Sequence, residues 1–201
     1  MLTFTHHGTA GEASPAADWN GGFDRGDGDG QVHFYTLFSG VDAMVMRLEM
    51  RAYTETRDKS DALEINFCAN GRFETSFSPR EHVLLKPGDM AVSCYNGSRG
   101  AQSESHFPLG YYEGICLRVC PDAASKWIER NAPAFSIDFD AMKRNLLRDK
   151  WYMYGSAGPR CEHVFRELYE NAAYADAPLL RLKTLEMLML LCRIPREAAQ
   201  D

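Results

Sequence analysis

The sequence predicts an α+β fold, in which an antiparallel β-barrel is followed by a C-terminal helical subdomain. Between Val32 and Val119, several short β-rich runs follow one another without a helical period between them, a pattern typical of an antiparallel barrel or sandwich. After Pro121 the pattern changes to helical periods. We therefore expect a leader over residues 1–30, a barrel domain over 31–120 and a helical linker or dimerisation segment over 121–201.

The leader is rich in Gly, Asp, Ala and Pro and closes with the sequence DRGDGDG. Such a composition buries little apolar surface, so we expect this segment to be flexible. The acidic residues leave a calcium loop as an alternative. Against it, the spacing lacks the bidentate Glu of an EF-hand, and no helices flank the segment.

Turn residues divide the barrel region into strands. The run QVHFYTLF ends at the turn Ser39-Gly40, and the run ALEINFCANGRFETSF is typical of a hairpin whose turn is Ala69-Asn70-Gly71. A Pro87-Gly88-Asp89 turn separates the two strands of HVLLKPGDMAVSCY. The run YYEGICLRVC is the last strand before Pro121.

Four helices are predicted after the barrel, and the last of them has an apolar seam. The helices cover PDAASKWIERN, DFDAMKRNLLRDK, GPRCEHVFRELYENAAY and PLLRLKTLEMLMLLCRI, with WYMYG as an extended piece between the second and third. In the last helix, Leu182, Leu185, Met189 and Cys192 recur at a spacing of three and four residues. This seam packs either on the barrel of its own chain or on a second subunit, and we expect a homodimer.

Composition and charge exclude several classes of protein. No apolar stretch is long enough to span a membrane, and the N-terminus lacks the apolar core of a secretory signal. None of the six cysteines forms a CxxC pair, and most lie in apolar runs, so we expect buried free thiols and a cytoplasmic protein. The net charge of −6 lacks the basic footprint that nucleic-acid binding requires.

Catalytic and metal-binding patterns are weak. There is no HxH, GxSxG or phosphate-binding loop in the sequence. A metal site would require His33, His82 and His106 to converge from separate segments, together with Glu64. We therefore expect no enzyme, with no catalytic residue, no metal ligand and no cofactor.

One long segment, LEINFCANGRFETSFSPREHVLLKPGDMAVS, resembles the sensor domain of the AraC family of bacterial transcription regulators. The resemblance rests on Glu64 within an apolar strand, on Gly71 in the turn after it and on the later turn at residues 87–89. HFPLGYYEGICLRV and the helices from GPRCEHVF to LEMLMLL are similar to the branch that includes siderophore-responsive activators. The similarity covers residues 31–194.

This resemblance implies a cupin-like barrel that binds a small effector, and a long helix that joins two subunits. It also implies a DNA-binding domain with two helix-turn-helix motifs, which the sequence up to Asp201 leaves no room for. We therefore expect the chain to contact DNA only through an absent C-terminal domain, as a truncated regulator or as a stand-alone relative. The alternative is a stand-alone cupin enzyme, such as a metal-dependent isomerase or dioxygenase.

Candidates for effector binding are the polar and aromatic residues on the predicted strands. Glu64 and Asn66 share one face of their strand, and the apolar side chains on either side of them share the other. Because the apolar face of a small barrel usually points inward, we expect Glu64 and Asn66 to face solvent. Arg47 either binds an anion in the pocket or lies at the surface, and we favour the surface. The full candidate set is Tyr35, Arg47, Glu64, Asn66, Tyr95 and Tyr112.

Overall fold

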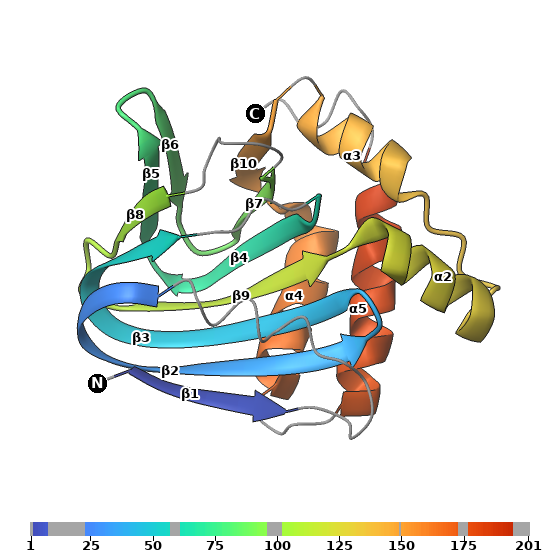
Figure 1. The fold of residues 1–201 in the computed structure, drawn as a ribbon, viewed down its shortest axis with the longest axis horizontal. Helices are drawn as coiled ribbons and strands as arrows, with labels where there is room; N and C mark the ends of the chain where they lie inside the picture. Colours follow the sequence, from blue (N-terminus) through green and yellow to red (C-terminus); the bar gives the residue numbers. More distant parts are fainter. Residues whose placement is uncertain are drawn as a thin grey trace.

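The computed structural model describes residues 2–7, 23–56, 61–95, 102–148, 150–172 and 177–194 (Figure 1). Within these residues the chain forms the predicted antiparallel barrel followed by helices, which confirms the α+β class. The strands are β1 (Leu2–His7), β2 (Phe23–Phe38), β3 (Val41–Thr56), β4 (Leu63–Gly71), β5 (Phe73–Ser78), β6 (Glu81–Leu85), β7 (Asp89–Cys94), β8 (Gln102–His106), β9 (Tyr112–Val119) and β10 (Tyr152–Ser156). The helices are α2 (Pro121–Asn131), α3 (Phe139–Leu147), α4 (Gly158–Ala172) and α5 (Ala177–Cys192).

The strands follow one another around the barrel in the order β10-β7-β4-β9-β3-β8-β5-β6, and β2 and β1 extend the wall beyond β3. The long strand β3 bends between the two walls of the barrel. Its first half pairs with β9, and its last residues pair with β8. Apart from the parallel pair of β1 with β2, the pairs are antiparallel.

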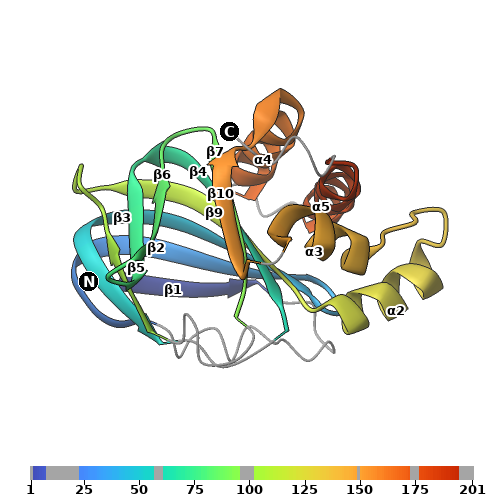
Figure 2. The ribbon, with the colours of Figure 1, turned by 90° about the horizontal axis from the view of Figure 1, so that it is seen from above.

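Two separate cores result from this arrangement. The inner core fills the barrel with apolar side chains such as Phe34, Met46 and Leu48. The outer core lies between the β2-β3-β9-β4-β7 wall and the helices, and it contains Phe67 stacked on Phe165 of α4 at 4.8 Å between ring centroids. Figure 2 shows α4 and α5 on the outer side of this wall, with α2 projecting from the end of β9.

The predicted hairpin between β4 and β5 is wrong. Strand β4 pairs with β7 along one edge and with β9 along the other, so it has no free edge for β5, which pairs with β6 and β8 instead. The Asn70-Gly71 turn therefore carries the chain from one wall to the other. Gly71 has a φ of +84°, and an added Cβ would lie 2.5 Å from the carbonyl oxygen of Tyr111.

The structure also corrects the flexible leader expected over residues 1–30. Leu2–His7 forms β1, in register with residues 30–35 of β2. Strand β2 begins at Phe23 and runs through the whole acidic sequence considered as a calcium loop. Backbone pairing with β2 and β3 orders these polar, glycine-rich residues without requiring apolar burial of their own. Residues 8–22 of the predicted leader lie outside the described residues.

The four predicted helices are confirmed, and the extended piece predicted at residues 151–155 forms β10 (Tyr152–Ser156), which joins the sheet against β7. Pro121 begins α2, where a missing N–H is tolerated. Asp138 caps α3 by accepting a hydrogen bond from the amide of Ala141 at 2.8 Å. Among the described residues, no helix has the length and hydropathy needed to cross a membrane.

The turn between β2 and β3 offers a test of this packing. Gly40 has a φ of +81°, and an added Cβ would lie 2.5 Å from the backbone nitrogen of Ala124 in α2. Gly110 has a φ of +75°, but an added Cβ there would meet no atom within 4 Å. We expect Gly110→Ala to lower the free energy of unfolding by about 1 kcal/mol, through backbone strain alone. Gly40→Ala should lower it by at least about 2–3 kcal/mol, because the new methyl group also meets α2. Urea unfolding of both variants measures the difference, and equal costs would contradict the close approach of α2.

Candidate functional site

A row of polar side chains crosses the inner face of the barrel at one end. Thr36 is the register partner of Asp42, and Asp42 is the partner of Arg118 on β9. Arg118 is in turn the partner of Glu64 on β4, and Glu64 is the partner of Ser93 on β7. These five residues have the same strand parity as the apolar side chains of the inner core, so they face the barrel interior. We call them the polar row.

The polar row is largely withdrawn from water. Asp42 is 1% exposed, Glu64 6% and Ser93 5%, and Arg118 is half-buried. Burial raises the pKa of Asp42 from 3.8 to about 6, and this rise is opposed by a hydrogen bond from Thr36 and by the positive charge of Arg118. Among the described residues, no hydrogen-bond partner reaches Oδ1 of Asp42. The site therefore contains a buried carboxyl group with a free acceptor oxygen.

Aromatic side chains gather beside the polar row. Trp151 packs edge-on against Phe77 at 4.7 Å between ring centroids, and Tyr95 lies 5.6 Å from Trp151. Tyr152 is the register partner of Ser93, so it adjoins the polar row directly. The indole nitrogen of Trp151 donates a hydrogen bond of 3.1 Å to Glu81, which fixes the orientation of the ring. This aromatic wall offers flat apolar surface beside buried polar groups.

Three of the six predicted effector-binding residues lie at this site. Glu64 and Asn66 face the barrel interior, and Tyr95 belongs to the aromatic wall. The expectation that Glu64 and Asn66 face solvent is wrong, because the apolar face of β4 packs under the helices in the outer core rather than inside the barrel.

Tyr112 lies deeper in the barrel. Its ring is 1% exposed and stacks on Phe107 at 5.3 Å, next to Phe73. Its hydroxyl donates a hydrogen bond of 3.3 Å to the carbonyl oxygen of Phe67, and burial raises its pKa well above 10. Tyr112 therefore helps to fill the barrel interior.

Tyr35 and Arg47 lie on the outer face of the wall, where they contact α4. The hydroxyl of Tyr35 donates a hydrogen bond of 2.7 Å to the carbonyl oxygen of Ala172, at the end of α4. Nε of Arg47 donates to the hydroxyl of Tyr169 at 3.1 Å, and the guanidinium lies 5.5 Å from the centroid of that ring. These two residues connect strands β2 and β3 to α4 and are separated from the polar row by the wall itself.

The four residues of the alternative metal site do not converge. His33 faces the outer side and contacts His7 at 3.2 Å, His82 is exposed on β6 and bonds Ser76, and His106 lies beside Glu104. Glu64 faces the interior. The described residues contain no group of three possible metal ligands.

The cysteines are free thiols, as predicted, and four of the six are buried. Burial raises the pKa of Cys68 to about 12, so this thiol stays protonated near neutral pH and is a poor nucleophile.

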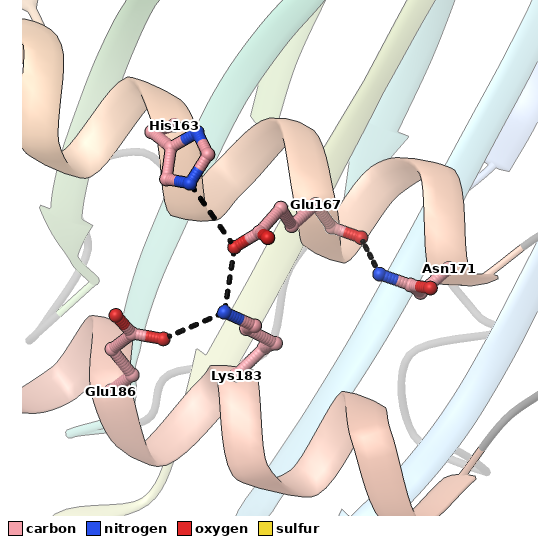
Figure 3. A network of polar contacts seen from close by, with 5 residues as sticks. All are labelled: His163, Glu167, Asn171, Lys183 and Glu186. Carbon is pink, nitrogen blue, oxygen red and sulfur yellow. Dashed lines mark hydrogen bonds and ion pairs between the residues drawn. The ribbon is translucent and has the colours of Figure 1, made fainter.

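Helix α5 is joined to α4 by charged side chains (Figure 3). Nζ of Lys183 lies 2.7 Å from the carboxylate of Glu167 on α4 and 3.0 Å from that of Glu186. His163 lies 3.6 Å from Glu167 on its other side. The bond to Lys183 lowers the pKa of Glu167, so this ion pair favours the ionised carboxylate and holds the two helices together.

The predicted dimerisation seam on α5 is only partly available. Leu185 is 7% exposed and belongs to the outer core, and the half-buried Cys192 donates through its thiol to the carbonyl oxygen of Asp138 before α3. Met189 is half-buried, and Leu182 is 53% exposed. The packing of the chain on itself therefore covers part of the seam and leaves Leu182 at the surface.

No family model matches the sequence, and no curated protein shows a significant similarity to it. Solved structures of similar fold include the AraC-like transcriptional activator CuxR, at 12% identity over 76% of this chain and 55% of that chain, with a TM-score of 0.39. They also include an HTH_3 family transcriptional regulator from Vibrio cholerae, at 11% identity over 45% of this chain and 50% of the other, with a TM-score of 0.37. A third is the cupin domain of an XRE family transcriptional regulator from Enterobacter cloacae, at 13% identity over 41% of this chain and 83% of the other, with a TM-score of 0.34.

The chain thus spans about half the length of two of these regulators.

The raised pKa of Asp42 predicts how stability depends on pH. Because the native pKa of about 6 exceeds the ordinary value of 3.8, the native state holds this proton to higher pH than the unfolded state. The carboxyl group therefore lowers the free energy of unfolding as pH rises from about 4 to about 6. Asp42→Asn removes this loss. Between pH 4 and pH 7, we therefore expect the free energy of unfolding of the wild type to fall by on the order of 2–3 kcal/mol more than that of the variant.

Urea unfolding at the two pH values measures this difference. Asp61→Asn, at an exposed side chain, is the matched control and should follow the wild type. If Asp42→Asn kept the pH dependence of the wild type, the assignment of a raised pKa to Asp42 would be wrong.

Proposed function

We propose that the chain is the effector-binding and dimerisation half of a transcription regulator, and that it is not an enzyme. The observation that carries this proposal is the polar row inside the barrel, with the aromatic wall beside it. The sequence resemblance to AraC-type sensor domains supports the regulatory role, with DNA contacted through a helix-turn-helix domain beyond Asp201. Reading the gene past the codon for Asp201 checks that part of the proposal, and a stop codon there would contradict it.

A polar row inside a barrel is costly to stability. Buried ionisable groups are often less stabilising than apolar side chains of the same volume, and the raised pKa of Asp42 is a sign of that cost. Perturbed ionisable groups of this kind cluster at functional sites. The free Oδ1 of Asp42 accepts hydrogen bonds, and the aromatic wall offers stacking surface. The effector class that fits is a small polar molecule with hydroxyl or amide donors and one flat apolar face.

The contacts between barrel and helices provide a route from the effector to α5. Tyr35 and Arg47 lie on the strands that carry Thr36 and Asp42, and they bond α4 on the opposite face of the wall. Helix α4 is joined to α5 through Lys183. A ligand shifts this arrangement only through its different affinity for two states of the molecule, and such coupling is typically about 1–3 kcal/mol.

A cupin enzyme is less well supported by this geometry. Its metal would have to bind His33, His82, His106 and Glu64, which lie on different faces and edges of the barrel. The interior groups that are close together are two carboxylates, two hydroxyls and a guanidinium.

Effector binding is tested by thermal unfolding of the protein in the presence of a panel of sugars, polyols, amino acids and hydroxylated aromatic acids. We expect one class to raise the melting temperature, because a ligand at 100 times its Kd stabilises the native state by about 2.7 kcal/mol. Glu64→Gln should abolish the rise, while Glu49→Gln, on an exposed position of β3, should leave it unchanged. A rise that persists in Glu64→Gln would place the effector elsewhere, and no rise with any class would favour a filled barrel.

Dimerisation through α5 is tested at Leu182. Placing a carboxylate in an apolar interface is strongly unfavourable, so Leu182→Glu should weaken dimerisation by at least about tenfold, as measured by sedimentation equilibrium. Leu109→Glu is the matched control, because Leu109 is 59% exposed on the turn between β8 and β9. Equal self-association of the two variants would rule out the seam.

A further inference from the structure

A pocket lies at the junction between the barrel and the helices, away from the polar row. It has a volume of about 390 Å³ and is lined by β7, β10, the first turn of α4 and the C-terminal end of α5. This volume is at the small end of the range of known ligand sites. The pocket is on the outer side of the wall, so the barrel strands separate it from the polar row.

The lining combines an apolar floor with positive charge. Met90, Met153, Leu190 and Ile194 supply apolar surface from both the barrel and α5. Arg160 on α4 and Arg193 after α5 supply two guanidinium groups, and both residues are exposed. The lining contains no Asp or Glu. In the part of the chain that the structure describes, no carboxylate pairs with either guanidinium.

The backbone adds to this positive charge. Gly158, Arg160 and Cys161 belong to the first turn of α4 and line the pocket. The N–H groups of a first helical turn have no partner within the helix, and they carry the positive end of the helix dipole. Ser156 accepts from the amide of Gly158 at 3.2 Å, and Pro159 has no N–H. The amides of Arg160 and Cys161 therefore favour an anion at the same end of the pocket as the Arg160 side chain.

We propose that this junction pocket binds a small organic carboxylate with an apolar body. The carboxylate pairs with Arg160 and Arg193, and the apolar body lies on the two methionines, Leu190 and Ile194. Methionine side chains adapt readily to ligands of different shape, so the pocket accepts a class of such acids. The proposal concerns a site separate from the polar row and does not depend on the function proposed above.

The location gives such a ligand a defined effect. It contacts β10 of the barrel and the last turn of α5 together, so it stabilises the arrangement in which they lie side by side. In a regulator, the binding of an acid here would restrict movement of α5 relative to the barrel.

Calorimetric titration with 4-phenylbutyrate, and with 4-phenylbutan-1-ol as its neutral analogue, tests the proposal on the full chain. We expect the acid to bind more tightly than the alcohol. The double variant Arg160→Gln, Arg193→Gln should weaken binding of the acid by at least about tenfold, because it removes both charged partners of the carboxylate. Its affinity for the alcohol should change little. Met153→Trp should weaken both by filling the floor of the pocket.

Two control variants distinguish binding in this pocket from binding elsewhere on the molecule. Arg51→Gln combined with Arg80→Gln removes two exposed arginines on other parts of the barrel and should leave both affinities unchanged, which excludes a general effect of net charge. Glu64→Gln should also leave them unchanged, which excludes binding at the polar row. Absence of binding at millimolar acid, equal affinity for acid and alcohol, or an acid affinity unchanged by loss of Arg160 and Arg193 would each overturn the proposal.

Discussion

The structure depends on one wall of strands that is buried on both faces. Phe34 of β2 points into the barrel, and its neighbour Tyr35 points under α4. The same alternation holds along β3, β9 and β4, so nearly every side chain in the wall has a defined set of neighbours. The barrel core buries the inner face of the wall, and the helices bury its outer face. The barrel and the helices therefore form one unit.

The same constraint decides what could be predicted from the sequence. Pro121 and the helical periods after it place the helices correctly, because capping and periodicity are local signals. The sequence could not predict that Glu64 faces the barrel interior. The usual rule assigns the apolar face of a strand to the interior, but Leu63 and Ile65 pack in the outer core instead. Asp42 was missed although it shares the parity of Met44 and Met46, because alternation does not distinguish two buried faces. The pairing of β4 with β7 and β9 is non-local, and no turn signal encodes it.

The polar row differs from the two cores in the chemistry of its buried side chains, which are polar or charged where those of the cores are apolar. Aromatic and aliphatic side chains fill the barrel around Tyr112, where the ring is fully enclosed and its hydroxyl has a backbone partner. At Asp42 the chain instead buries a carboxyl group. Burial raises its pKa, and the ionised group lowers the stability of the native state. Positions that weaken a fold while the rest of it is well packed are expected at sites selected for another property. The contrast between these two regions is the strongest structural indication of where a function lies.

Strand β3 has a consequence for the motions of the molecule. Its sixteen residues pair with β2 along one edge and with β9 and then β8 along the other, so it is shared by both walls of the barrel. Neither wall can open without breaking its bonds. We therefore expect the amide hydrogens of residues 41–48, which lie between β2 and β9, to be released only when the barrel unfolds and to exchange slowly with solvent. Among the described strands, β1 pairs with β2 alone, so we expect its amide hydrogens to exchange through local fraying. The barrel thus has a stable central strand and a weakly held edge strand.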